Sequence, residues 1–385
     1  MDVQFVPLVD AVHGISGWED LAETAAEPNA FLDPRFLRPC ASHLEEAEDV
    51  ELAVVRDGNE LVALHAFSDQ PIQLRGVAPV ATSTSGRFFD QVMAVRRPLI
   101  SGTDPAGAAT SLLQAMSLSE RPGVLAMVGA PGEGKVAEAI RAAAVDCNMP
   151  RHTLSTFETA WYRRKSVPPR KSAGARELVD IVAGQTYLST SARKKMKQRL
   201  RAMERTFGPV SLVDRSKDPL AVDDFLALEN AGWKGDVSQG GAAYAAESKS
   251  AWLREVAHQF RDSGHLYVNE LRAGATTVYL AIELRSGDGV FALRETFNEE
   301  AAKFSPGLLG RVLVQNRILS IPGVQFYDPC MGEAAPEVQR LLPERRTHET
   351  YMLAVRGTGR KAALRMYSRL GARHRAKRDS EGGES

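Results

Sequence analysis

The run AKFSPGLLGRVLVQNRILS occupies residues 302–320 and follows VFALRETF at 290–297, which has the composition of a β-strand. Pro306 suits the first turn of a helix, because its missing N–H would have no partner there. The other amides of that turn, with the positive end of the helix dipole, form a site for an anion such as a pyrophosphate. Lys303 and Arg311 are close by in sequence. The plainer alternative is that Ser305 only caps a buried helix.

The segments on either side continue this mixture of strands and helices. In the second half we expect strands at 265–274, 276–287, 290–297, 323–329 and 346–356, and helices at 190–208, 222–235, 248–264 and 302–320. In the first half we expect a hairpin at 50–68, a strand at 123–129, and helices at 106–119 and 135–149. The pattern predicts an α+β (mixed α/β) fold of two domains, each a mixed, mostly antiparallel central sheet flanked by helices.

The same pattern divides the chain into four segments. We expect an N-terminal domain at 1–162, a basic linker at 163–189 that contains Pro168-Pro169, a C-terminal domain at 190–356, and a basic helix and tail at 357–385.

The charge is balanced overall and uneven along the chain. The 385 residues carry 48 Lys and Arg against 48 Asp and Glu, but residues 1–60 hold 14 acidic and 3 basic residues. Residues 356–378 hold seven Arg and two Lys without an acid. Such a distribution permits binding of phosphates, nucleotides or an anionic membrane surface.

Several classes of protein are excluded by composition. No run approaches the roughly 20 apolar residues of a membrane span. The acidic N-terminus lacks the pattern of a signal peptide, so we expect a cytoplasmic protein. Cys40, Cys147 and Cys330 are scattered, which predicts neither a disulfide framework nor a zinc site.

A second phosphate-type motif lies in the first half. The run Gly129-Ala-Pro-Gly-Glu-Gly134-Lys135 fits GxxxxGK between a strand and a helix. The next residue is Val136, which has no oxygen for magnesium. We therefore interpret this loop as a turn and not as a nucleotide-hydrolase site.

Five segments taken in order resemble a known family. They are FLALENAGWKG (225–235), ALRETFN (292–298), FSPGLL (304–309), FYDPC (326–330) and LPER (342–345). This order resembles the CelD-type acyltransferases of the GNAT superfamily, to which FemAB-type tandem-GNAT transferases are related. The resemblance covers most of the chain, and the Ser-Pro-Gly segment is its most specific part. It implies that the protein acts in making or modifying bacterial surface polysaccharide, as a holdfast-polysaccharide N-acetyltransferase does.

The resemblance also implies a donor site and a mechanism. Acetyl-CoA would bind with its pyrophosphate at the helix start, on Ser305, Pro306, Gly307, Leu308, Leu309, Gly310 and Arg311. An amine on a sugar or lipid-linked sugar would attack the thioester directly, so that neither a metal nor an enzyme nucleophile is needed.

Proton transfer and acceptor binding need further side chains. We expect Asp328 to be the base or the orienting carboxylate, with Arg294 and His348 as the other catalytic candidates, and Trp233, Lys234 and Tyr327 to contact the acceptor. Each has a plainer interpretation: a turn residue before Pro329 for Asp328, and a structural role for the others. The family often has Asp where this chain has Asn298, which argues against a base at that position.

The C-terminal run GRKAALRMYSRLGARHRAKR, residues 359–378, places Arg365, Arg369 and Arg373 at helical spacing. It is either a solvated tail, an amphipathic helix on an anionic membrane, or a grip for a phosphate-rich regulator such as the cyclic dinucleotide c-di-GMP.

Two other functions stay open at this point. One is a FemAB-type transferase that takes its aminoacyl group from tRNA, with the basic helix 191–205 on the RNA. The other is an inactive nucleotide-sensing module of a polysaccharide synthase.

Overall fold

The computed structural model describes residues 2–11, 14–72, 79–166, 177–236, 238, 244, 246–332 and 344–381, with side chains up to residue 369 in the last segment. The chain forms two compact units. Unit 1 comprises Met1–Ala41, Glu45–Glu158 and Arg346–Ser385, and unit 2 comprises Ser42–Leu44 and Thr159–Arg345. In the part of the chain that is described, no helix has the length and apolar character needed to cross a membrane.

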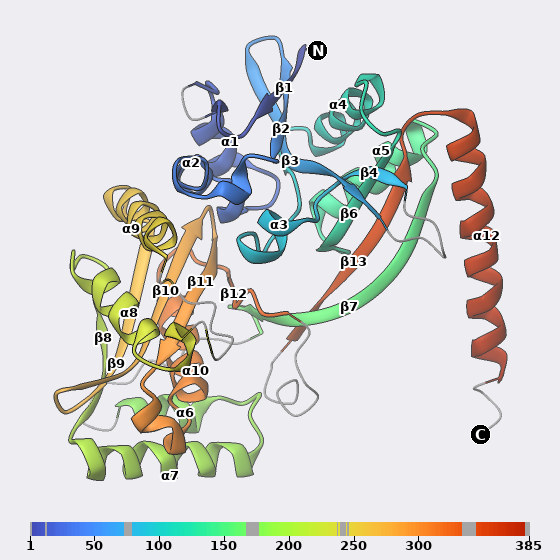
Figure 1. The fold of residues 1–385 in the computed structure, drawn as a ribbon. Helices are drawn as coiled ribbons and strands as arrows, with labels where there is room; N and C mark the ends of the chain where they lie inside the picture. Colours follow the sequence, from blue (N-terminus) through green and yellow to red (C-terminus); the bar gives the residue numbers. More distant parts are fainter. Residues whose placement is uncertain are drawn as a thin grey trace. The chain divides into compact units, whose positions relative to one another are not determined.

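Unit 1 is a mixed sheet with helices (Figure 1). Its strands are β1 (Asp2–Pro7), β2 (Glu51–Asp57), β3 (Glu60–Pro71), β4 (Val80–Ser83), β5 (Leu99–Ile100), β6 (Val124–Pro131), most of β7 (Arg151–Arg163) and most of β13 (Glu344–Ala354). Its helices are α1 (Trp18–Thr24), most of α2 (Pro34–His43), α3 (Arg87–Gln91), α4 (Pro105–Leu118), α5 (Lys135–Asp146) and α12 (Thr358–Glu381).

The sheet of unit 1 has the order β1-β2-β3-β4-β6-β13-β7. β1 to β4 are antiparallel neighbours, and the turn between β2 and β3 uses Gly58 at a φ of 58°. β4 and β6 are parallel, and α4 lies in the connection between them. β13 comes from the far end of the sequence and pairs antiparallel with β6. Leu112 of α4 and Ile140 of α5 pack into the core of this unit.

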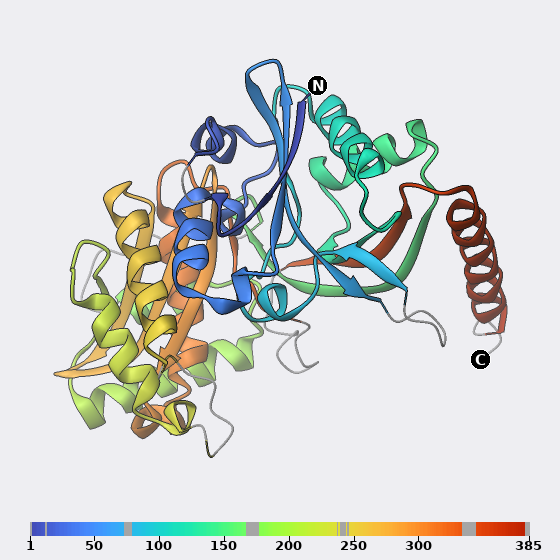
Figure 2. The same cartoon turned by 45° about the horizontal axis from the view of Figure 1, so that its top comes forward.

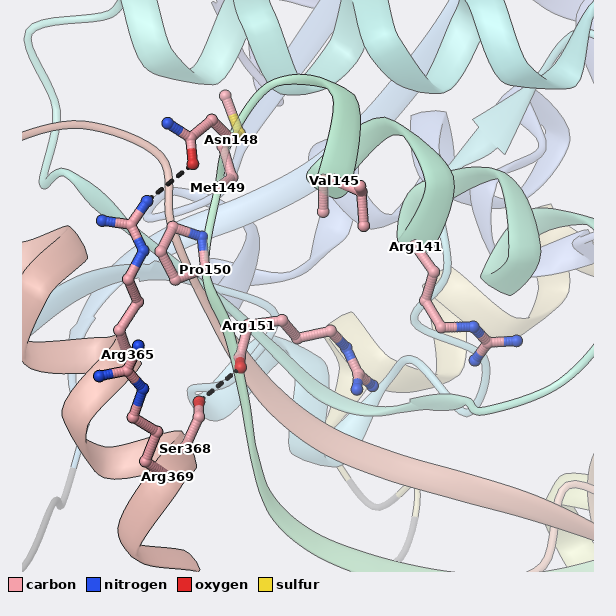
Figure 3. Close-up of a pocket in the computed structure, with 10 residues that line it drawn as sticks. Arg141, Val145, Asn148, Met149, Pro150, Arg151, Arg365, Ser368 and Arg369 are labelled. Carbon is pink, nitrogen blue, oxygen red and sulfur yellow. Dashed lines mark hydrogen bonds between the residues drawn. The ribbon is translucent and has the colours of Figure 1, made fainter. Parts of the chain in front are cut away.

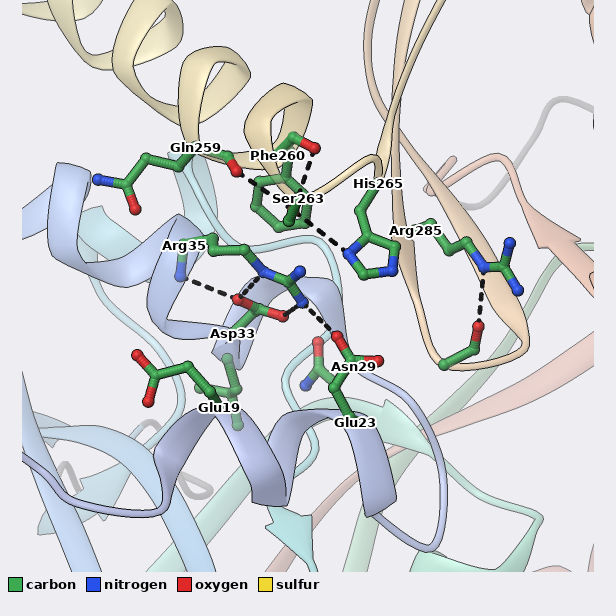
Figure 4. Close-up of polar contacts among 12 residues, drawn as sticks. Glu19, Glu23, Asn29, Asp33, Arg35, Gln259, Phe260, Ser263, His265 and Arg285 are labelled. Carbon is green, nitrogen blue, oxygen red and sulfur yellow. Dashed lines mark hydrogen bonds and ion pairs between the residues drawn. The ribbon is translucent and has the colours of Figure 1, made fainter.

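The segment from α1 to α2 is held by charged groups (Figure 4). The guanidinium of Arg35 lies 2.6 Å from the buried carboxylate of Asp33 and 2.7 Å from that of Glu23. Because Asp33 is fully buried, its ion pair with Arg35 offsets the cost of removing the carboxylate charge from water.

Unit 2 repeats the same plan (Figure 2). Its strands are β8 (Val210–Asp214), β9 (Leu266–Ala273), β10 (Thr276–Ser286), β11 (Gly289–Phe297) and β12 (Phe326–Asp328), with the end of β7 beside β12. Its helices are α6 (Glu177–Gly184), α7 (Thr190–Phe207), α8 (Ala221–Asn230), α9 (Glu247–Asp262) and α10 (Pro306–Ser320), with short 3₁₀ turns η4 (Trp233–Gly235) and η6 (Glu299–Phe304).

In unit 2 the strand order is β8-β9-β10-β11-β12-β7. β9, β10 and β11 are antiparallel, whereas β11 and β12 are parallel and joined through α10. The α10 side of the sheet is apolar, with Tyr279 and Leu313 in one core cluster. Gly310 lets α10 come close to the sheet, because a Cβ there would overlap the Tyr279 ring. The predicted fold, two domains of mixed and mostly antiparallel sheet with helices, is confirmed.

The compact units do not coincide with the segments expected from the sequence. Residues 346–356 were expected in the C-terminal domain, but they pair with β6 and belong to unit 1. The expected linker 163–189 contains the helix α6, whose Val182 is fully buried in the core of unit 2. Pro168-Pro169 lies outside the described residues.

Candidate functional site

The parallel strands β11 and β12 of unit 2 stay together for three residue pairs only. Gly289, Val290 and Phe291 of β11 face residues 326–328 of β12, where β12 ends. β11 continues to Phe297, so its second half has lost this neighbour. On its other edge, the pairing with β10 shifts register and leaves Leu293 unpaired. Such bulges are common beside active sites, because they redirect the strand and its side chains.

The start of α10 lies just after the free end of β11. Ser305 adopts a left-handed conformation with φ 53° and makes no side-chain capping bond. The first amide bond of the helix runs from Leu309 to the carbonyl of Ser305, at 3.1 Å. Among the described residues, the amides of Gly307 and Leu308 therefore have no acceptor. This helix start can hold an anion, and the plainer interpretation, that Ser305 caps the helix, does not hold.

The corresponding helix of unit 1 differs at the same point. α4 also has Pro at its first position, but its N-cap is Asp104. The Asp104 carboxylate accepts the amide of Gly107 at 2.9 Å. A side-chain anion already occupies this helix start, so an external phosphate would be repelled. This difference favours unit 2 for the anion site.

Polar backbone groups of the GxxxxGK loop of unit 1 also have hydrogen-bond partners within the protein. At the start of α5, the carboxylate of Glu27 lies 3.4 Å from the amide of Val136. Glu27 is bonded in turn to Arg346 at 3.0 Å, and Arg346 also reaches the carbonyl of Glu133. The interpretation of this loop as a turn agrees with these contacts.

Asp328 and Arg294 come together around Cys330. Asp328 is buried and accepts the Cys330 amide at 2.8 Å, which is the turn expected before Pro329. Burial and the nearby Asp328 carboxylate raise the pKa of the Cys330 thiol well above its ordinary value, against the opposing effect of the Ala292 amide and Arg294. A raised pKa disfavours the thiolate, which argues against Cys330 as a nucleophile.

Arg294 is held on the α9 side of the sheet. Its guanidinium bonds to the hydroxyl of Tyr244 and lies 5.7 Å from the ring centroids of both Tyr244 and Trp252. It also donates to the carbonyl of Leu293 at 2.8 Å. Arg294 thus connects the bulge of β11 to the segment leading into α9.

A pocket of about 300 Å³ lies at the end of β11. It is lined by two segments, residues 228–234 and residues 296–300. Trp233 and Lys234, expected from the sequence to contact an acceptor, both line it. The Lys234 ammonium bonds to Glu229 at 2.9 Å. Phe297 and Glu299, which sequence analysis did not select, lie here because of the turn into η6, and no local pattern pointed to them.

Comparison with known proteins agrees with this geometry. Residues 190–335 match the family model of the GNAT acetyltransferase domain. Residues 190–335 therefore carry a GNAT acetyltransferase domain, which supports an acyltransferase activity. The matched residues contain β11, the start of α10 and β12, so the domain coincides with the anion site of unit 2.

Three solved structures share the fold at low sequence identity. A conserved protein of unknown function from Bacteroides thetaiotaomicron VPI-5482 is 13% identical, with a TM-score of 0.55 over 91% of this chain and 99% of that one. A DUF2156 domain from Agrobacterium fabrum is 13% identical, with a TM-score of 0.50 over 90% and 93%. FemX is 7% identical, with a TM-score of 0.50 over 92% and 97%. Among curated proteins, no sequence matches the chain significantly.

The remaining residues expected at the donor site of the GNAT domain have varied surroundings. Ser305, Gly307 and Leu308 are partly exposed, whereas Pro306, Leu309 and Gly310 are buried. Arg311 is paired with Glu295 of β11 through its Nε at 2.7 Å, and Glu295 also accepts the Tyr279 hydroxyl at 2.8 Å. Of the residues expected at the donor site, Gly307 and Leu308 are therefore the two whose amides are available to an anion.

Tyr327 and His348 are the other two side chains expected at the site. Tyr327 is buried under α10 in the apolar core, 6.0 Å from the ring of Tyr162. His348 belongs to unit 1, where its Nδ1 is 3.0 Å from the carbonyl of Gly129 and its ring stacks on Phe157 at 5.3 Å.

The C-terminal arginines line a separate pocket of about 560 Å³ in unit 1 (Figure 3). Arg365 donates to Asn148 at 2.7 Å, and Ser368 donates to the carbonyl of Arg151 at 2.7 Å. Arg369 also lines the pocket. Arg373 lies in α12, but its side chain is outside the described residues.

Proposed function

We propose that the protein transfers an acyl group, most simply acetyl from acetyl-CoA, to an amine on a sugar or lipid-linked sugar of a bacterial surface polysaccharide. The observation that carries the donor assignment is the uncapped start of α10, with the amides of Gly307 and Leu308 without an acceptor among the described residues. A pyrophosphate supplies the anionic oxygens that such a helix start binds. The sugar acceptor rests on the resemblance to CelD-type transferases.

The proposed chemistry takes place where β11 and β12 diverge, beside the bulge at Leu293. The donor supplies an acyl carbon bound to a thiol leaving group. The amine nitrogen attacks that carbon, a C–N bond forms and the C–S bond breaks. The nitrogen loses one proton and the departing thiolate gains one, so the reaction needs a proton acceptor and a proton donor.

Asp328 is the proposed proton acceptor or orienting group for the amine. It is buried at the end of β12, where the strands part. Arg294 is proposed to position the bulge, because it bonds to the Leu293 carbonyl and lies near the rings of Tyr244 and Trp252. In the proposed mechanism the amine attacks the thioester directly, and the raised pKa of the Cys330 thiol argues against an acyl-cysteine intermediate.

The donor site is tested with Gly307→Asp. A Cβ at Gly307 meets only the Phe297 ring at 3.6 Å, and an acid in the first turn suits the helix dipole, so the variant should fold. We expect calorimetric titration to show acetyl-CoA binding to the wild type and at least tenfold weaker binding to Gly307→Asp. The matched control is Gly14→Asp, where a Cβ has open space. Equal binding by wild type and Gly307→Asp would remove the donor assignment.

A second candidate, an aminoacyl-tRNA donor, is supported by α7. This helix is basic, with Lys194, Lys195 and Arg201 exposed, while Met196 and Met203 bury its other face. Salt-sensitive tRNA binding that Lys194→Glu, Lys195→Glu abolishes, together with no affinity for acetyl-CoA, would favour this donor.

A regulatory ligand is proposed for the pocket beside α12. Arg365 and Arg369 line it with Arg141 and Arg151, and several guanidinium groups around one cavity suit a phosphate-rich ligand such as c-di-GMP. We expect Arg369→Ala to weaken c-di-GMP binding in a titration, with Arg87→Ala, an exposed arginine elsewhere in unit 1, as the control. Unchanged binding in Arg369→Ala would exclude this pocket.

A further inference from the structure

The pocket at the end of β11 combines aromatic and acidic groups in unit 2. Its lining includes the rings of Trp233 and Phe297 and the carboxylates of Glu229, Glu299 and Glu300. Glu299 is held at the pocket by the amide of Trp233, which donates to it at 3.3 Å. The backbone amide of Glu300 donates to Asn298 at 2.9 Å, which keeps the turn in place. The pocket is therefore formed by ordered contacts between two segments far apart in the sequence.

The two aromatic rings are unusually exposed. Trp233 is 51% and Phe297 37% accessible to solvent. The other large apolar side chains that are exposed in the described part of the chain are all aliphatic or Met. Both exposed aromatic rings thus line one pocket. An exposed ring offers a flat apolar surface, which suits the C–H face of a sugar ring.

The charge of the pocket excludes one class of ligand and favours another. Lys234 is neutralised by Glu229 at 2.9 Å, so Glu299 and Glu300 leave the lining negative. These carboxylates would repel a phosphate inside the pocket, whereas the proposed pyrophosphate site on the Gly307 and Leu308 amides is not part of its lining. Hydroxyl groups and protonated amines can donate to carboxylates, so an amino sugar satisfies both the rings and the acids.

The position of the pocket separates it from the proposed point of transfer. Phe297 is four residues beyond the bulge at Leu293 along β11, which corresponds to about 13 Å at strand spacing. At its other side, Phe297 is next to Gly307 at the start of α10. A sugar in this pocket is too far from the bulge to carry the amine that reacts there.

We propose that residues 228–234 and 296–300 form a carbohydrate subsite that binds a second sugar unit of the acceptor. The acceptor is therefore an oligosaccharide containing amino sugars, and not a single amino sugar. This inference rests on the proposed function for the place of the chemistry, while the subsite itself rests on the pocket.

The test compares glucosamine and its β-1,4-linked trimer as acceptors of the acetyl group from acetyl-CoA. The reaction rate is measured from the release of free CoA thiol. We expect kcat/KM for the trimer to exceed that for the monomer by at least tenfold. Trp233→Ala should raise the KM for the trimer about tenfold more than the KM for glucosamine, and Trp233→Phe should restore most of the loss. The matched control is Leu220→Ala, at an exposed apolar residue of unit 2 outside this pocket.

Calorimetric titration of the trimer in the absence of donor gives a readout that does not depend on activity. Trimer binding that Trp233→Ala abolishes supports the subsite even if no acetylation is seen, in which case the proposed function alone fails. Equal kcat/KM for the monomer and the trimer would overturn the inference. The same loss of kcat with the monomer and with the trimer in Trp233→Ala would also overturn it. Neither result would contradict the proposed transferase function. Binding of a lysine-containing peptide in place of the trimer overturns the sugar assignment.

Discussion

The buried His65 makes unit 1 sensitive to acid. It lies on β3 and is 1% exposed, and neither ring nitrogen has a hydrogen-bond partner in the described part of the chain. Burial lowers the pKa of His65 from 6.5 to about 4. The folded protein therefore keeps this ring neutral at a pH where the unfolded chain binds a proton.

The sign and size of the change in unfolding free energy with pH follow from the different proton affinities of the folded and unfolded chain. A depressed pKa in the folded state means that stability is present above pH 6.5 and is lost as the pH falls toward 4. Between pH 7.5 and pH 4.5 the loss due to this one group is about 2.5 kcal/mol, since a tenfold difference in proton affinity between the folded and unfolded chain corresponds to about 1.4 kcal/mol. His65→Leu removes the titrating group and its unsatisfied nitrogens.

The assay is chemical denaturation of wild type and His65→Leu at several pH values from 4.5 to 7.5. The difference in unfolding free energy should grow by about 2.5 kcal/mol in favour of the variant as the pH falls. His258→Leu is the control, because this histidine is exposed on α9. Parallel curves for wild type and His65→Leu would refute the reasoning, because they would show that the ring binds its proton equally in both states.

Three further predictions concern Glu283, Gly310 and Asp104. Burial raises the pKa of Glu283 from 4.5 to about 8, against the opposing effect of the hydrogen bond from Asn269, so the free energy of unfolding falls as the pH rises between these values. Glu283→Gln should remove this pH dependence, which amounts to about 3.5 kcal/mol of unfolding free energy between pH 4.5 and 7.5 in the same denaturation assay. Gly310→Ala should cost about 1–3 kcal/mol in thermal or chemical unfolding, because its Cβ meets the buried Tyr279 ring; a stability equal to wild type would contradict this packing. Asp104→Ala should lose about 1 kcal/mol of stability and leave calorimetric acetyl-CoA binding unchanged, whereas strengthened binding would indicate a donor site at the start of α4 in unit 1.

Local patterns in the sequence were sufficient for most helices and strands of the described chain. The turn at Gly58 places the hairpin of β2 and β3, and Pro306 marks the start of α10 as expected. These features depend on backbone propensities and apolar spacing within a few residues. Local sequence could not decide whether Ser305 caps its helix. Ser305 and Asp104 both precede a Pro, and only the folded backbone shows which of the two side chains bonds to the helix amides.

The sequence by itself determined the element types, the two-domain α+β plan and the position of one helix start suited to an anion. Only the tertiary structure decided which strands are neighbours, because a partner strand is chosen by hydrogen bonds over long separations. β13 pairs with β6 across more than 200 residues, which puts His348 in unit 1, whereas Asp328 belongs to unit 2. The pocket of Trp233 and Phe297 likewise exists only because two distant segments meet at the end of β11.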